Sequence, residues 1–189
     1  MHKNNFNLDD YFGVLKNTID HLNRDDIRKF ADLLLETKEK NKKVIIFGNG
    51  GSAATASHFA CDINKGVSYN RTNRFKVLSL TDNIPTILAY SNDISYDVIF
   101  IEQLKNLLEP EDIVIGISGS GNSINVIKAI EYASSQGNTT IGITGYDGGK
   151  LKEIADLSIN ANVNDMQISE DIHMILVHVL MRILCSRDE

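Results

Sequence analysis

The sequence has few of the residues that cross-link a chain or carry it into a membrane. It contains two cysteines, Cys61 and Cys185, which lie far apart, two prolines and no tryptophan. No apolar run approaches the roughly 18 residues that cross a bilayer, so we expect no membrane span. Residues 1–13 have no apolar core behind a positive start, which argues against a secretory signal. We therefore expect a cytoplasmic chain without disulfides.

Basic residues are also in the minority, with 19 Lys and Arg against 25 Asp and Glu and a net charge of -6. No cluster of Lys and Arg interrupts that balance. Because proteins that bind nucleic acid need a basic surface for the phosphate backbone, we do not expect nucleic acid as a partner. An anionic small molecule would have to be held locally, by backbone amides and hydroxyl groups.

The 189 residues are enough for one domain, and we expect a single domain over residues 1–189. Short apolar runs rich in β-branched residues predict strands that are covered on both faces. Segments of helical length and composition alternate with them, which predicts a three-layer αβα sandwich around a five-stranded parallel sheet. The predicted strands are 44–47, 77–80, 113–117, 140–144 and a weaker one that starts at Leu157. The predicted helices between and after them are 52–64, 95–108, 122–136 and 168–183.

Helices also precede the sheet and end the chain. Residues 1–42 show two amphipathic helices broken around residues 23–25, and we expect this helical hairpin to serve in oligomerisation. The helix at 168–183 is apolar on nearly all sides, so it requires burial on most of its surface. Together these helices favour a homo-oligomer over a monomer.

Two of the predicted strands end in glycine-rich loops that lead into helices, at 47–59 and 116–126. Beyond the carboxyl ends of parallel strands, helix N-termini offer free N–H groups to an anion. The second loop adds the hydroxyls of Ser118, Ser120 and Ser123 to accessible amides, which suits a phosphate monoester. Neither loop matches a P-loop or a dinucleotide motif. The alternative is that these residues only form turns and helix caps, with Ser52 and Asn122 or Ser123 as the caps.

Two sets of ionisable residues could carry chemistry. His58 and Asp62 share a helix face, so they could ligate a metal, form an acid/base pair or make an ordinary surface contact. The second set lies in the apolar last helix, where ionisable groups need partners: Glu170, Asp171, His173 and His178. Glu170 and His178 are about 12 Å apart along that helix, so one ion can hardly be reached by both from one chain. If both serve one kind of site, a neighbouring subunit must supply one of them.

Six motifs in order resemble the sugar isomerase (SIS) domain, and more closely its phosphoheptose isomerase branch. Members of that branch interconvert sedoheptulose 7-phosphate and D-glycero-D-manno-heptose 7-phosphate. The resemblance covers nearly the whole chain and implies a flavodoxin-like sandwich. The motifs are GNGGSAATASHFACDI from Gly48, SLTDN from Ser79, YSNDISYDVIF from Tyr90, GISGSGNSINVIKAI from Gly116, GITGYDGGKL from Gly142 and EDIHMILVHVL from Glu170.

The resemblance implies a role for individual residues. It makes Asp62 and His178 the expected proton-transfer pair and implies a Zn²⁺ ion held by His58, Asp62, Glu170 and His178. It also implies a tetramer with active sites at the subunit junctions. The residues expected to contact the phosphorylated sugar are Asn49, Gly50, Gly51, Ser52, Asp62, Asn92, Asp93, Ser118, Gly119, Ser120, Ser123 and Glu170.

The chain departs from the family pattern at four of these or neighbouring positions. The family usually has Glu at Asp62, Gln at Glu170, Thr at Gly119 and, in many members, Asp at Gln167. The first hypothesis is a phosphosugar aldose/ketose isomerase that acts on sedoheptulose 7-phosphate through an enediol, for the heptose of bacterial surface polysaccharides. The alternatives are an isomerase of another phosphosugar and a non-catalytic SIS protein that resembles the replication-initiator-associating regulators and acts by binding a partner.

Overall fold

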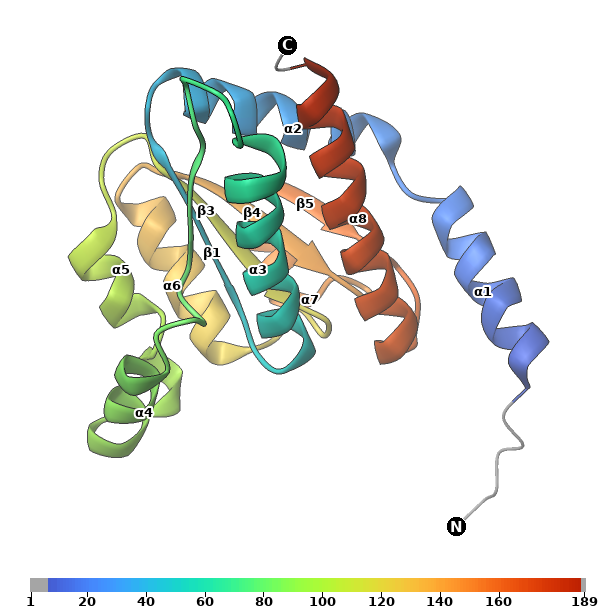
Figure 1. Ribbon diagram of the computed structural model, residues 1–189. Helices are drawn as coiled ribbons and strands as arrows, with labels where there is room; N and C mark the ends of the chain where they lie inside the picture. The colour runs from blue at the N-terminus through green and yellow to red at the C-terminus, as the bar shows by residue number, and fades with distance from the viewer. Residues whose placement is uncertain (1–6, 188–189) are drawn as a thin grey trace.

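The computed structural model describes residues 7–187 and contains a five-stranded, all-parallel sheet with the strand order β2-β1-β3-β4-β5 (Figure 1). The register pairs Val44 with Val77 on one side and with Ile113 on the other. All five predicted strands are confirmed, with small differences at their ends. They are β1 (Lys43–Gly48), β2 (Lys76–Ser79), β3 (Ile113–Ser118), β4 (Thr139–Thr144) and β5 (Leu157–Asn160).

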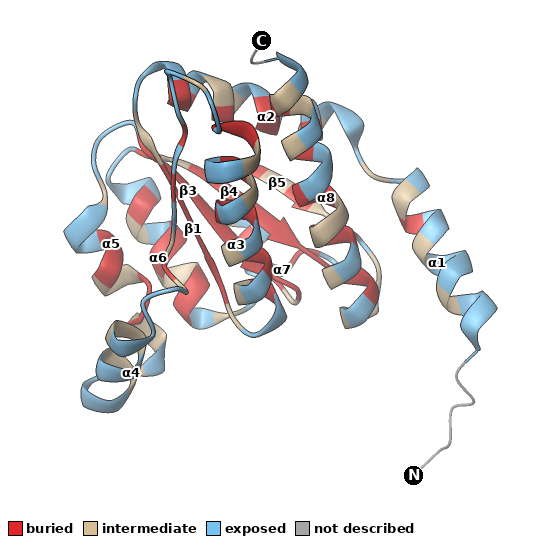
Figure 2. Cartoon of the chain, viewed as in Figure 1, coloured by how far each residue is buried: buried red, intermediate tan, exposed pale blue. Residues whose placement is uncertain are grey.

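Helices cover both faces of the sheet, which confirms the three-layer architecture. Alternate residues of β1 point to opposite sides: Val44 and Ile46 join one apolar cluster, whereas Ile45 and Phe47 join another. Figure 2 shows the central strands β1, β3 and β4 buried between the two helical layers. The first cluster includes residues of α2 (Arg24–Glu39), α3 (Gly51–Cys61) and α8 (Met166–Arg187). The second includes residues of α5 (Ile101–Leu107), α6 (Ile124–Ser135) and α7 (Gly149–Ile154).

The two amino-terminal helices are α1 (Leu8–Asp20) and α2. They are separated at residues 21–23, slightly before the predicted break, because the side chain of Asn23 caps α2 by accepting from the backbone N–H groups of Asp25 and Asp26. Helix α1 packs on α8, where the Tyr11 hydroxyl donates to Asp171 over 2.6 Å. That hydrogen bond, with burial, raises the pKa of Tyr11 to about 12. The use of these helices in oligomerisation stays a prediction.

Four helical segments differ from the sequence-based prediction, and one of them is α7, which was not predicted. The helix predicted at 52–64 is α3 followed by a π-helix, η1 (Asp62–Val67), and the one predicted at 95–108 is a 3₁₀ turn, η2 (Tyr96–Val98), followed by α5. Helix α4 (Ile84–Asp93) was not predicted. It has no buried residue, and its apolar side chains Ile84 and Leu88 are exposed, so its sequence lacks a core-facing stripe. It protrudes from the body of the domain (Figure 1).

Helix α8 lies beside α3 and buries one face, from Ile168 to Leu184, against the sheet layer. Val179 on its other side is 38% exposed, so a single chain does not cover the helix on all sides. Among residues 7–187, no helix is both long enough and apolar enough to cross a membrane.

His173 is a buried ionisable group on α8. It is 1% exposed, and neither ring nitrogen forms a hydrogen bond of good geometry. Burial lowers the pKa of His173, and the backbone of Thr144 opposes this shift. A folded-state pKa below the unfolded value means that the neutral ring favours folding. The stability that neutral His173 contributes is therefore lost as the pH falls below about 6.5, the pKa of histidine in the unfolded chain.

We expect the free energy of unfolding to fall by up to about 1.4 kcal/mol for each pH unit below about 6.5 because of His173. Replacing His173 with Leu, which fills a similar apolar space without a titratable group, should make the stability less dependent on pH in this range. Urea unfolding at several pH values between about 7.5 and 5.5 measures both curves. Parallel curves for the two proteins would exclude His173 as the source.

Candidate active site

The two glycine-rich loops lie side by side at the carboxyl edge of the sheet, because β1 and β3 are neighbouring strands. The chain leaves these two strands in opposite directions, toward α3 on one face and α6 on the other, and such a switch point is where open α/β sheets bind ligands. A cavity of about 280 Å³ opens there. It is lined by Asn49, Gly50, Gly51, Ser52, Ile117, Ser118, Gly119, Ser120, Ser123, Met166 and Glu170.

The serine hydroxyls of the second loop are not used as helix caps. Ser123 stands at the N-cap position of α6, but its side chain makes no capping hydrogen bond and instead lies 3.0 Å from the hydroxyl of Ser118. Asn122 bonds within its own loop and accepts from the backbone N–H of Lys150. Helix α3 begins at Gly51 with Gly50 as its N-cap, so Ser52 is not a cap either. Ser52 and Ser123 therefore do not cap the helices that follow their loops, whereas Ser120 accepts from the backbone N–H of Asn122 in a local turn.

Gly121 gives the serine loop its shape. Its φ of +68° lies in the left-handed region, and a Cβ atom there would collide with the backbone carbonyl of Gly148. Its N–H donates to the carbonyl of Ser118, and its own carbonyl accepts from the N–H of Leu151. The serine loop is therefore held in place by its contacts with Gly148, in the turn between β4 and α7, and with Leu151 in the first turn of α7.

Glu170 reaches the same cavity from α8. Its carboxylate lies against Gly51, where a Cβ atom would collide with it. Because Gly51 is the first residue of α3, the carboxylate lies near the positive end of that helix. Its position in the cavity is consistent with the predicted substrate contact, which stays a prediction.

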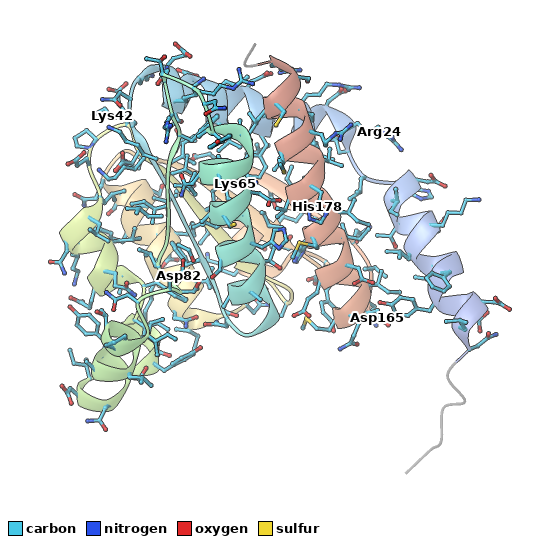
Figure 3. The ribbon with its side chains drawn as sticks, in the orientation of Figure 1. Arg24, Lys42, Lys65, Asp82, Asp165 and His178 are labelled. Atoms are coloured by element: carbon cyan, nitrogen blue, oxygen red, sulfur yellow. The ribbon has the colours of Figure 1, made fainter. Side chains whose placement is uncertain are left out.

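A second group of polar residues lies farther along the same two helices. The Nε2 atom of His58 is 3.3 Å from Oδ2 of Asp62 and 3.2 Å from Nε2 of His178. The Oδ2 atom of Asp62 and the Nε2 atom of His178 are 4.0 Å apart. Figure 3 shows His178 on α8, on the side facing α3. Asp62 begins the π-helix η1, a type of turn that is frequent at functional sites. One chain therefore assembles all three residues.

This group fits a metal ion. Its three ligand atoms lie within 4.8 Å of one another. Ligand atoms around a tetrahedral Zn²⁺ with bonds of about 2.0–2.1 Å are separated by roughly 3.3 Å, which is close to two of the three distances. Glu170 was predicted as a fourth ligand, but within residues 7–187 it is outside the group that meets this limit. It lies near the start of α3, whereas His58 is about two helical turns farther along.

Asn92 and Asp93 do not line the cavity. They end helix α4, where the Asn92 amide donates to the Asp93 carboxylate over 2.8 Å, and both side chains are exposed. The segment is linked to the cavity at Tyr96, whose hydroxyl donates to Oδ1 of Asn49 over 2.8 Å. The predicted contact of Asn92 and Asp93 with the sugar stays a prediction.

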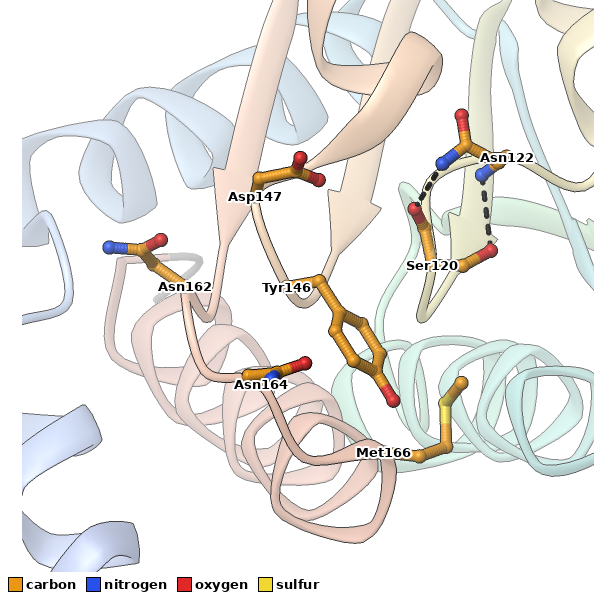
Figure 4. Close-up of a pocket in the computed structure, with 7 residues that line it drawn as sticks. All are labelled: Ser120, Asn122, Tyr146, Asp147, Asn162, Asn164 and Met166. Atoms are coloured by element: carbon orange, nitrogen blue, oxygen red, sulfur yellow. Dashed lines mark hydrogen bonds between the residues drawn. The ribbon is translucent and has the colours of Figure 1, made fainter.

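A larger cleft that sequence reasoning missed adjoins the cavity. It has a volume of about 580 Å³ and shares Ser120 and Met166 with the smaller cavity (Figure 4). Met166 packs on Gly119, where a Cβ atom would collide with its sulfur. The Met166 thioether therefore forms part of the wall between the cavity and the larger cleft. It occupies the volume that a side chain at position 119 would fill. The lining residues are Ser120, Asn122, Tyr146, Asp147, Asn162, Asn164 and Met166.

Comparisons with known proteins agree with the geometry. Residues 10–145 match the sequence model of the SIS domain. A probable phosphoheptose isomerase of Thermoplasma acidophilum is 39% identical over 160 residues, which are 85% of this chain and 87% of the relative. The phosphoheptose isomerase of Helicobacter pylori strain P12 is 36% identical over 167 residues, or 88% of this chain and 86% of the relative.

Solved structures of phosphoheptose isomerases have the same fold as this chain. The phosphoheptose isomerase of Neisseria gonorrhoeae superposes with a TM-score of 0.85 at 28% identity, and that of Francisella tularensis with a TM-score of 0.87 at 26% identity. Each alignment covers 94% of both chains. Sequence, fold and the position of the cavity at the sheet edge agree, and the chain belongs to the phosphoheptose isomerase branch of the SIS-domain family.

Proposed function

We propose that this protein is a phosphosugar aldose/ketose isomerase that converts sedoheptulose 7-phosphate to D-glycero-D-manno-heptose 7-phosphate, a precursor of surface-polysaccharide heptose. One observation carries the proposal: a serine-lined cavity and the His58–Asp62–His178 group lie along the same pair of helices. Gly51 and His58 are about 10 Å apart along α3. A phosphate bound at the cavity and reacting carbons near His58 therefore require a long, extended sugar chain between them.

The reaction moves a proton between C1 and C2 and another between their oxygens, through an enediol. It needs a base that faces the carbons and a group that stabilises negative charge on oxygen. Asp62 and His178 are the proton-transfer pair in this proposal, since their Oδ2 and Nε2 atoms are 4.0 Å apart and both are accessible from solvent. The hydroxyls and loop amides at Ser118–Ser123 hold the remote phosphate, and Asn49, Gly50, Gly51, Ser52 and Glu170 contact the sugar.

Zinc is the proposed cofactor. His58, Asp62 and His178 would hold the ion, because imidazole nitrogens and a carboxylate oxygen are ligands that Zn²⁺ prefers. When bound, the ion would act as a Lewis acid toward a substrate oxygen. Glu170 would need to change its position to join the shell from the same chain.

A homo-oligomer, with a tetramer as the proposed form, is consistent with the apolar surface that one chain leaves uncovered. Leu8 and Phe12 on α1 are 58% and 57% exposed, and an apolar groove of about 230 Å³ runs between α1, α2 and α8. Subunit contacts over these helices would cover both features. We also propose that these subunit contacts place the active sites at the junctions between subunits.

Replacing Ser120 and Ser123 together with Ala should weaken phosphosugar binding at least about tenfold. Each hydroxyl contributes roughly 1.5 kcal/mol or more as a hydrogen bond to a charged group, and about 1.4 kcal/mol corresponds to a factor of ten. Calorimetry with sedoheptulose 7-phosphate measures the change. Ser135→Ala is the control, because that hydroxyl donates to its own helix at Tyr132, away from the cavity. Unchanged affinity in the double variant would remove the phosphate site from this loop.

The proposed function is tested by turnover of a small panel of ketose phosphates by purified protein, with added zinc and with a chelator. Sedoheptulose 7-phosphate should be the best substrate, and chelation should lower its turnover. Faster turnover of another ketose phosphate would reassign the substrate. A protein that binds no zinc and turns over no member of the panel would instead have a partner-binding role.

A further inference from the structure

The side chain of Asn49 is held by two residues that sequence reasoning did not single out. Its Nδ2 donates to Oδ1 of Asn125, and Nδ2 of Asn125 donates back to Oδ1 of Asn49, each over 2.9 Å. The Tyr96 hydroxyl is 2.8 Å from the same Asn49 oxygen. Asn125 is only 2% exposed and lies in the first turn of α6. A buried amide and a hydroxyl therefore converge on one side chain at the cavity.

A backbone group fixes the direction of every hydrogen bond in this network. The N–H of Val126 points to a side-chain atom of Asn125 at 2.9 Å, and because a backbone N–H can only donate, that atom is Oδ1. The other atom of the Asn125 amide is then the nitrogen, which must donate to an oxygen of Asn49. The Tyr96 hydroxyl faces the same oxygen, so it too must donate.

Counting hydrogen-bonding groups shows what Asn49 has left for a ligand. Its oxygen has two lone pairs, and Asn125 and Tyr96 occupy both. Its nitrogen has two hydrogens, and Asn125 accepts one. A single N–H group remains, on a residue that lines the cavity together with the serine loop.

We propose that Asn125 and Tyr96 are positioning residues that hold Asn49 as an obligate hydrogen-bond donor to an oxygen atom of the ligand. The inference deepens the proposed function and rests on it, since a phosphosugar presents acceptor oxygens along its whole length. Tyr96 also connects Asn49 to the segment that carries Asn92 and Asp93. The position of that segment and the orientation of the cavity amide are therefore coupled.

Kinetics of the variants Asn125→Ala and Tyr96→Phe test the proposal. Asn125→Ala should raise KM for sedoheptulose 7-phosphate at least about fivefold, and Tyr96→Phe about twofold to threefold, with smaller changes in kcat. In the double variant Asn49→Ala with Asn125→Ala, the second change should add nothing to the KM of Asn49→Ala alone, because Asn125 acts through Asn49.

Asn138→Ala is the matched control. This amide is also buried, at 4% exposed, and donates to the carbonyls of Glu109 and Asp112, but it lies just before β4, at the opposite edge of the sheet. It should lower the melting temperature as Asn125→Ala does while leaving KM unchanged. Equal KM values for Asn125→Ala and Asn138→Ala, or additive effects in the double variant, would overturn the proposal.

An independent readout separates this inference from the proposed reaction. In ¹⁵N-labelled protein, the Asn49 side-chain hydrogen that is donated to Asn125 should exchange slowly with solvent, and Tyr96→Phe and Asn125→Ala should accelerate that exchange whereas Asn138→Ala should not. Fast exchange in the wild type would overturn the inference. A wild type that shows slow exchange but no turnover would overturn the proposed function and leave the positioning network supported.

Discussion

Replacing His178 with Ala should lower isomerase turnover at least about a hundredfold and leave the fold intact. General acid–base groups contribute roughly 10²–10⁴ in rate, and His178 is also one of three candidate metal ligands. Its side chain is 55% exposed, so its removal creates no core cavity. Steady-state kinetics, metal content and a melting curve measured on the same preparation distinguish lost chemistry from lost structure.

His21→Ala is the control for this experiment. His21 is also exposed, and within the described residues its ring bonds only to the carbonyl of Asn17 at the end of α1, far along the chain from the candidate ligands. This variant should keep wild-type turnover and metal content. If His178→Ala retained more than about a tenth of wild-type turnover, His178 would have no proton-transfer role.

Replacing Gly121 with Ala should destabilise the protein by about 3 kcal/mol and abolish measurable phosphosugar binding. The added methyl group would occupy a left-handed backbone position and collide with the carbonyl of Gly148. To relieve that collision, the serine loop must move away from the turn between β4 and α7. That movement displaces Ser118, Ser120 and Ser123 together. Urea unfolding and calorimetry with sedoheptulose 7-phosphate measure the two effects.

Gly137→Ala separates strain from collision. Gly137 has a φ of +80°, but a Cβ atom there would meet nothing within 4 Å. The left-handed conformation alone should cost about 1 kcal/mol, and binding should be unchanged because Gly137 lies before β4, away from the cavity. Equal losses of stability in the two variants would mean that the contact between Gly121 and Gly148 does not hold the loop.

The sheet could be predicted because its central strands β1, β3 and β4 are apolar runs buried on both faces, whereas β2, predicted to be covered on both faces, exposes Leu78. Val44–Phe47 and Ile113–Ile117 carry this signal without interruption. Helix α4 could not be predicted in the same way, since it packs no buried side chain and its exposed Ile84 and Leu88 give no periodic stripe. Helix α7 has six residues, too few to show a helical period.

The site was predictable where a local pattern marks it. Glycine and serine at strand ends indicated the cavity, and the four-residue spacing of His58 and Asp62 indicated the polar group that His178 completes. Contacts between distant parts of the chain carried no such signal. Asn49 and Asn125 are 76 positions apart, and Met166 reaches Gly119 from the start of α8. Only the folded chain brings these residues together.

The central claim is that this site isomerises a phosphosugar by proton transfer through an enediol. Incubating the protein with sedoheptulose 7-phosphate in D₂O and following the products by NMR tests it directly. The account predicts an aldose heptose 7-phosphate that carries solvent deuterium at C2, formed by the wild type and not by His178→Ala. An aldose without deuterium would contradict proton exchange at the base, and the absence of any aldose would contradict the isomerase function itself.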